Sequence, residues 1–108
     1  MQRGNVVLIN LSGDYGKPRP CVIVQNDLFH SLESVLIAPI TSDVSVDVDI
    51  FRIILKPTKS NGLLKQSQIM LDKIVAVRKS KIKKVIGKLN RVQLADINKK
   101  IILLFGIS

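Results

Sequence analysis

The chain is poor in residue types that many catalytic and disulfide-linked proteins depend on. Its 108 residues include one cysteine, one histidine and no tryptophan. One cysteine cannot close a disulfide within the chain, and one histidine excludes an acid–base mechanism that uses two histidines of the same chain. The sequence also has no Cys/His cluster with zinc-binding spacing and no glycine-rich phosphate loop before a helix, so we expect neither a metal nor another cofactor.

Long apolar runs are absent as well. No run approaches the roughly 18 residues of a membrane-spanning helix, and the N-terminus lacks the charged and apolar regions of a secretory signal. We therefore expect a cytoplasmic protein with no membrane partner. Aromatic residues are limited to one tyrosine and three phenylalanines, which argues against a surface that stacks several bases.

Acidic residues are also scarce. The chain has 8 Asp and Glu against 17 Lys and Arg, and its formal net charge is +9. This balance favours an anionic partner, either a nucleic acid or an acidic protein, although a basic surface can also serve solubility alone.

Short apolar runs bounded by turn residues recur along the chain and predict six or seven strands. The predicted strands cover residues 6–11, 21–25, 35–40, 51–55, 68–71, 74–77 and 85–89. A length of 108 residues, of which 46% are hydrophobic, is enough for one small domain with its own core. We therefore predict a single domain over residues 1–108, mainly β, built as a strongly bent antiparallel barrel.

The C-terminal segment changes from alternation to helical spacing. Seven apolar residues form or widen one helical stripe: Leu94, Ala95, Ile97, Ile101, Ile102, Leu104 and Phe105. Asn90 is a candidate N-cap, Gln93 its capping-box partner, and Gly106 a candidate stop. We predict a C-terminal helix that closes one end of the barrel or packs on its face, with this stripe in the core.

Arg19 is the most constrained candidate for chemistry. Pro18 and Pro20 flank it, and each proline fixes its own φ and restricts the preceding residue to extended conformations. A guanidinium at the start of a strand with so little backbone freedom is poised to meet an anion. Cys21 follows in the same apolar strand, where a buried reduced thiol is expected rather than a reactive nucleophile.

Two adjacent hydroxyls, Thr41 and Ser42, follow the apolar strand that ends at Ile40. One arginine and these hydroxyls suit RNA self-cleavage, in which the neighbouring 2′-hydroxyl attacks the phosphate and the protein stabilises charge on the phosphoryl oxygens. The guanidinium supplies a planar donor fork, and the threonine hydroxyl adds a neutral hydrogen bond that orients the phosphate. This chemistry requires no metal.

Four segments, in this order, resemble the MazF/PemK (Kid) family of toxin endoribonucleases over nearly the whole chain. They read RGNVVLINL, KPRPCVIVQND, IAPITS and GLLKQS, at residues 3–11, 17–27, 37–42 and 62–67. The resemblance implies an SH3-like barrel of the CcdB/MazF type with a C-terminal helix, and a homodimer. It also implies sequence-selective cleavage of single-stranded mRNA to a 2′,3′-cyclic phosphate and a 5′-hydroxyl, and an acidic MazE-like antitoxin as inhibitor.

The resemblance assigns roles to residues of these segments. It places Arg19 and Thr41 in catalysis and Ser42 in substrate binding. Lys17, next to the proline-flanked arginine, is a further substrate-binding candidate. Tyr15, in the preceding loop, could stack one base.

An Arg-x-Asp on a later strand is implicated in acid–base catalysis in the Kid/PemK branch of the family. By resemblance, Met70 stands at the arginine position, where core packing is expected, and Asp72 stands at the aspartate position. Asp72 is therefore a third catalytic candidate, although it could instead order Arg19 or pair with Lys73.

One loop departs from the family pattern, and several charged residues can be explained as ordinary surface residues. The loop at residues 12–18 is short and lacks the usual glutamate, with Asp14 its nearest acidic residue. Arg78 and Lys79 begin a basic run, residues 78–84, that could bind the RNA backbone or form a solvated turn. His30 is expected at the surface, and the carboxylates at 47 and 49 are expected on a solvated or antitoxin-facing edge.

Two alternatives to the endoribonuclease remain at this point. A barrel with a decayed site would bind RNA or protein without cleavage, and the short loop and Met70 are what such decay would look like. A CcdB-like gyrase poison shares the fold. However, that group engages gyrase through a tryptophan near the C-terminus, and this chain has none.

Overall fold

Seven strands and a C-terminal helix form the part of the chain that the structure describes. The computed structural model describes residues 1–10, 17–45 and 50–107. The strands are β1 (Asn5–Ile9), β2 (Arg19–Ile23), β3 (Ser34–Thr41), β4 (Arg52–Leu55), β5 (Ser67–Met70), β6 (Val75–Arg78) and β7 (Ile82–Lys88), followed by α1 (Arg91–Phe105). Three short 3₁₀ turns lie between them: η1 (Asp27–Phe29), η2 (Leu71–Lys73) and η3 (Lys79–Lys81). Each predicted strand is present, with ends shifted by a few residues.

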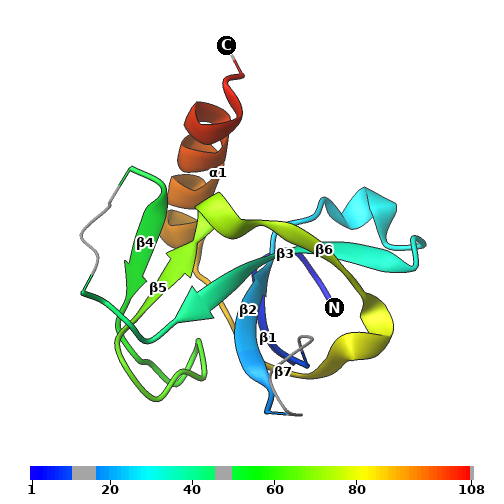
Figure 1. Ribbon diagram of the computed structural model, residues 1–108, viewed down its shortest axis with the longest axis horizontal. Coiled ribbons are helices and arrows are strands. Elements are labelled where there is room, and N and C mark those ends of the chain that lie inside the picture. Colours follow the sequence, from blue (N-terminus) through cyan, green and yellow to red (C-terminus); the bar gives the residue numbers. More distant parts are fainter. Residues whose placement is uncertain (11–16, 46–49, 108) are drawn as a thin grey trace.

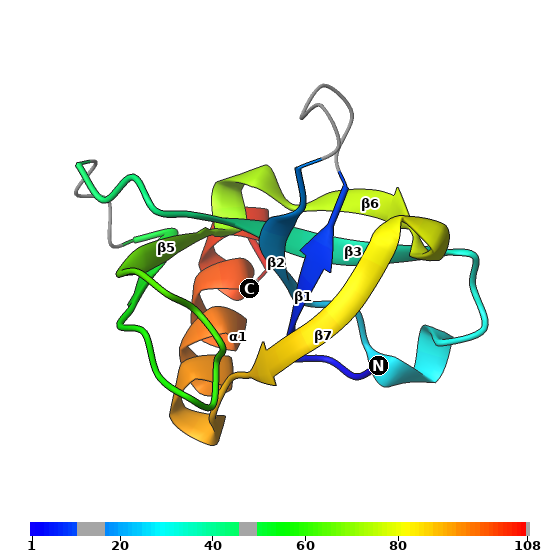
Figure 2. The same ribbon diagram turned by 90° about the horizontal axis from the view of Figure 1, so that it is seen from below.

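All strand pairs are antiparallel, as predicted, and β3 is the strand that joins the two halves of the sheet. The strand order is β4-β5-β3-β2-β1-β7, and β6 also pairs with β3. Residues 34–37 of β3 pair with β6, residues 37–39 pair with β2, and the last two residues pair with β5. Figures 1 and 2 show the result: β4, β5 and α1 lie on one side of the molecule, and β6 and β7 on the other.

The strands β1, β2 and β3 are buried on both faces. On one face, Val22 and Ala38 belong to a cluster that includes Ile97 of α1. On the opposite face, Cys21 and Ile37 belong to a second cluster inside the barrel. Cys21 is fully buried, as the sequence predicted.

The helix α1 begins and ends at the predicted residues. Asn90 accepts a hydrogen bond from the Gln93 backbone at 2.8 Å, and the Gln93 side chain accepts one from the Asn90 backbone at 2.8 Å, which completes the capping box. Gly106 adopts a left-handed φ of 69° at the C-cap. None of the helices among the described residues is long and apolar enough to cross a membrane.

The prediction that the whole apolar stripe of α1 lies in the core is wrong for its C-terminal part. Ile97 is fully buried, and Leu94 and Ile101 pack against the same cluster. Ala95 is exposed in the first half of the helix, and further along the exposed residues of the predicted stripe are Ile102, Leu104 and Phe105. Fifteen helical residues span about 22 Å, so the last turns extend beyond the strands that the helix covers (Figure 1).

Candidate active site

β2 and β3 stop pairing where the two main candidates lie. Their ladder ends with Cys21 opposite Pro39, and β3 then pairs with β5, placing Thr41 opposite Gln68. Because a proline has no N–H, neither Pro20 nor Pro39 can donate a hydrogen bond to extend the ladder. The ends of β2 and β3 therefore separate at this point.

A hollow of about 280 Å³ opens between these separated strand ends. Its lining residues are Arg19, Pro20, Pro39, Ile40, Thr41, Ser42, Ser67 and Met70. The structure thus brings together Arg19, Thr41 and Ser42, three of the residues predicted from the sequence. Met70, for which core packing was expected, is half-buried at the wall of this hollow.

A second hollow of about 460 Å³ adjoins the first and shares Arg19, Pro20, Ser42 and Ser67 with it. Three lysines line it: Lys17, Lys65 and Lys84. Its apolar lining includes Leu8, Leu64 and Ile86. We call the two hollows together the groove. Lys17, predicted to bind substrate, lies in the groove beside Arg19.

The loop between β4 and β5 forms one wall of the groove because its backbone lies directly against β7. At Gly62, with φ +71°, an added Cβ would lie 2.2 Å from the Ile86 oxygen. At Gly87 an added Cβ would lie 2.4 Å from the Asn61 carbonyl carbon. Asn61 is 2% exposed and holds the loop by accepting two backbone hydrogen bonds and donating one. Leu64 follows this closely packed segment and is 94% exposed at the wall.

Thr41 is oriented by the turn that follows it. The backbone N–H of Asp43 donates to Thr41 Oγ1 at 3.1 Å, which leaves the threonine's own hydroxyl hydrogen able to donate to a ligand. The pKa of Asp43 lies below its ordinary value, mainly because Ser45 donates side-chain and backbone hydrogen bonds to the carboxylate, and to a smaller extent because of the positive charge of Arg52.

Asp72 is held by an arginine that the sequence did not single out. It lies in η2, and its Oδ1 is 3.4 Å from Nε of Arg52 on β4. Asp72 is not among the described residues that line the groove. Arg52 is also the cross-strand neighbour of Met70, the position where the family resemblance leads one to expect an arginine. No local pattern around Arg52 marks it, because this neighbour relation exists only in the folded sheet.

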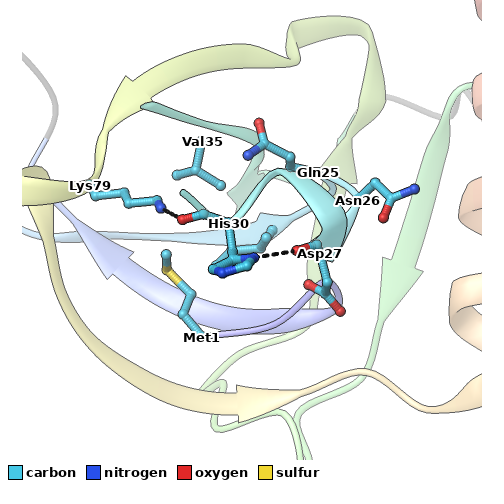
Figure 3. Close-up of a pocket in the computed structure, with 8 residues that line it drawn as sticks. Met1, Gln25, Asn26, Asp27, His30, Val35 and Lys79 are labelled. Atoms are coloured by element: carbon cyan, nitrogen blue, oxygen red, sulfur yellow. Dashed lines mark hydrogen bonds between the residues drawn. The ribbon is translucent and has the colours of Figure 1, made fainter. Parts of the chain in front are cut away.

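Arg78 and Lys79 lie far from the groove. Arg78 pairs with Ser34 at the start of β3, whereas Thr41 is the last residue of that strand, a separation of roughly 20 Å along the strand. Figure 3 shows Lys79 at a different cavity, where it donates a hydrogen bond to the backbone oxygen of His30. That cavity measures about 20 Å³, room for one water molecule. His30 is exposed, as predicted.

Four residues singled out from the sequence lie outside the described residues: Asp14, Tyr15, Asp47 and Asp49. The suggested stacking of a base on Tyr15 stays a prediction for that reason. The interpretations of Asp14 as the nearest acidic residue of the loop, and of Asp47 and Asp49 as a solvated or antitoxin-facing edge, also stay predictions.

Residues 2–105 match the family described as PemK-like, MazF-like toxins of type II toxin–antitoxin systems. The chain belongs to this family. The family resemblance noted in the sequence is thereby confirmed. A relative, the probable endoribonuclease MazF of Mycolicibacterium smegmatis, is 32% identical over 109 residues, which cover 100% of this chain and 99% of that protein.

Solved structures share the fold of this MazF-like chain. The Mycobacterium tuberculosis toxin MazF-mt6 superposes with a TM-score of 0.82 at 22% identity, covering 96% of this chain and 98% of that one. An endoribonuclease in complex with its cognate antitoxin, from a mycobacterial species, has a TM-score of 0.82 at 17% identity, covering 100% and 97%. These likenesses confirm the predicted fold class, a mainly β MazF-type barrel with a C-terminal helix.

Proposed function

We propose that this MazF-like toxin is a sequence-selective endoribonuclease that cleaves single-stranded mRNA in the groove, with Arg19 and Thr41 as its catalytic residues. The observation that carries the proposal is that these two residues, from different strands, line one hollow with Ser42 between the separated ends of β2 and β3. The 32% identity to a probable endoribonuclease over the full chain supports the same reaction.

The reaction is attack of a ribose 2′-hydroxyl on the adjacent phosphorus. The bond between the 2′-oxygen and phosphorus forms as the 2′-proton leaves, and the bond from phosphorus to the 5′-oxygen breaks as that oxygen takes up a proton. The products are a 2′,3′-cyclic phosphate and a 5′-hydroxyl. Arg19 stabilises the charge that develops on the phosphoryl oxygens, and the Thr41 hydroxyl donates to one of them.

The second hollow suits the nucleotides that flank the cleaved bond. Its lysines, Lys17, Lys65 and Lys84, can each neutralise a phosphate of the strand. The side chains of Leu8 and Leu64 offer apolar contact to unstacked bases, which a single strand exposes and a duplex does not. Ser42 lines both hollows and would contact the strand where it passes between them.

Two of the substrate-binding candidates, Arg78 and Lys79, lie outside the groove. They lie beside the start of β3, and we assign them to a distant part of a long RNA. The net charge of +9 attracts such a strand over the whole surface.

We also propose an acidic MazE-like antitoxin and a second copy of this chain as protein partners, acting in the cytoplasm. One solved relative is described as an endoribonuclease in complex with its cognate antitoxin. A net charge of +9 is complementary to an acidic inhibitor. The exposed apolar end of α1 offers a surface for the second copy.

The proposal is tested by incubating the purified protein with a long single-stranded RNA in excess EDTA and mapping the cuts. We expect cleavage at a recurring short sequence, with a 2′,3′-cyclic phosphate and a 5′-hydroxyl at each cut, because neither the attack nor the charge stabilisation requires a metal. As a control, an oligonucleotide with one 2′-deoxyribose at a mapped site should resist cleavage there. Activity that returns only with added divalent ions, or products with 5′-phosphates, would contradict the mechanism.

A further inference from the structure

Arg52, outside the predicted site, lies on the same face of the sheet as Thr41. In the paired strands β4, β5 and β3, Arg52 stands opposite Met70, and Gln68 stands opposite Thr41. Met70 and Gln68 are two residues apart on β5, so their side chains point to one face, and their cross-strand partners share it. Two strand spacings, about 10 Å, separate the backbones of β4 and β3, a distance that an arginine side chain largely spans.

Arg52 is held by hydrogen bonds at its guanidinium and at its backbone oxygen. Its Nε lies 3.4 Å from Asp72 Oδ1, and one terminal nitrogen donates to Gln68 Oε1 at 3.2 Å. Its backbone oxygen accepts a hydrogen bond from Lys100 of α1 at 3.1 Å. Gln68 is 2% exposed and is the cross-strand neighbour of Thr41. The guanidinium is therefore fixed in place beside the strand that carries the candidate threonine.

The arginine retains donors for a further acceptor. The Arg52 side chain is 12% exposed. A guanidinium carries five N–H groups, and among the described residues Asp72 and Gln68 are its hydrogen-bond partners, which engage two of them. Its charge also reaches the turn after Thr41, where it helps to lower the pKa of Asp43. Arg52 thus stands on one side of Thr41, while Arg19 comes from β2 on the other.

We propose that Arg52 is a second phosphate-binding arginine of the RNA site, and that Asp72 and Gln68 are positioning residues that hold its guanidinium. The inference rests on the proposed function and deepens it. RNA entering the groove places one phosphate between Arg19 and Thr41, and Arg52 binds a phosphate of the same strand on the β5 side of Thr41. Asp72 then acts through Arg52 and not on the 2′-hydroxyl.

The test measures binding of a fluorescein-labelled 2′-fluoro oligoribonucleotide of mixed sequence, which cannot cleave itself, at several salt concentrations. A phosphate contact to a single strand contributes about 0.7 to the slope of log affinity against log salt. We expect Arg52→Gln to lose about that much slope and roughly tenfold in affinity. Arg52→Lys should keep the slope and lose part of the affinity, since the charge stays but the fork does not.

Arg91→Gln is the matched control, because Arg91 is an exposed arginine at the start of α1 outside the groove. It should keep both slope and affinity. An unchanged slope in Arg52→Gln, with only a lower melting temperature, would assign Arg52 to fold stability and overturn the inference. This outcome is separate from failure of the proposed function, which would show as an absence of RNA cleavage by the wild type.

Discussion

At the scale of single residues, Arg19 owes its position to the prolines on either side of it. Pro18 and Pro20 fix the local backbone, and the missing N–H of Pro20 helps to end the ladder with β3. Arg19 therefore lines the hollow that opens where this ladder ends. Thr41 lines the same hollow because the pairing of β3 with β2 ends at Pro39, and the next two residues of β3 pair with β5.

Arg19→Lys should remove most cleavage while the fold is kept. A lysine ammonium cannot span two phosphoryl oxygens as the guanidinium fork does, so we expect a loss of about 100-fold in the single-turnover rate. The measurement uses an RNA oligonucleotide with one mapped site, with circular dichroism to verify folding. Lys17→Arg serves as the control, since it keeps a cation in the groove and should change the rate little. A folded Arg19→Lys protein with near wild-type rate would remove Arg19 from the mechanism.

Asp72→Asn separates two possible roles of that carboxylate. If Asp72 positions Arg52, the asparagine keeps part of the hydrogen bonding, and we expect a moderate loss of rate with the same dependence on pH. If Asp72 accepted the 2′-proton, one limb of the wild-type pH–rate profile would vanish, because an amide cannot take that proton. Single-turnover profiles of both proteins on the same oligonucleotide distinguish the roles. A vanished limb would contradict the assignment of Asp72 to positioning.

At the scale of elements, what the sequence could predict depends on whether the signal was local. The strands follow from alternation and the capping box at Asn90 from a short motif. The choice of Arg19 and Thr41, which line one hollow, came from their chemistry and from the family resemblance. Arg52 could not be found this way, because its relation to Met70 and Asp72 depends on the register between β4 and β5. Likewise, the basic run that begins at Arg78 does not reveal that it lies beside the start of β3, away from Thr41.

The exposed end of α1 is a second feature that a local sequence pattern could not predict. Helical spacing correctly predicted the buried side chain of Ile97. The spacing could not show that the helix extends beyond the strands on which it packs. That depends on the relative lengths of elements that are far apart in the sequence. Residues with the same spacing, such as Leu104, are therefore exposed.

Gly87→Ala should destabilise the protein by displacing the wall of the groove. The new Cβ would lie 2.4 Å from backbone atoms of residues 60 and 61, so the loop between β4 and β5 must move away from β7. Overpacking of this kind costs about 1–3 kcal/mol, measurable by urea unfolding, and RNA affinity should fall with it. Gly106→Ala is the control: its Cβ meets no atom within 4 Å, and only its positive φ should cost about 1 kcal/mol. Equal losses in the two variants would show that the loop adapts freely.

At the scale of the whole molecule, a small barrel combines a strong positive charge with unburied apolar side chains. The charge of +9 suits the attraction of RNA and of the acidic inhibitor proposed above. At the end of α1 and just beyond it, Leu103, Phe105 and Ile107 are 62%, 60% and 58% exposed. Large apolar side chains exposed together at one end of a molecule are typical of a protein–protein interface.

We expect the protein to be a dimer through this end of α1. Burying the Phe105 side chain against a second copy removes apolar surface from water at about 25 cal/mol per Å², whereas Phe105→Glu would place a charge in the interface. Sedimentation at about 10 µM, a concentration well above the dissociation constants of stable dimers, should give a dimer for the wild type and a monomer for Phe105→Glu with an unchanged circular dichroism spectrum. Val92→Glu is the matched control, because Val92 is an apolar residue that is 78% exposed in the first turn of the same helix, and it should stay dimeric. A monomeric wild type would refute the dimer, and a dimeric Phe105→Glu would place its interface on another surface.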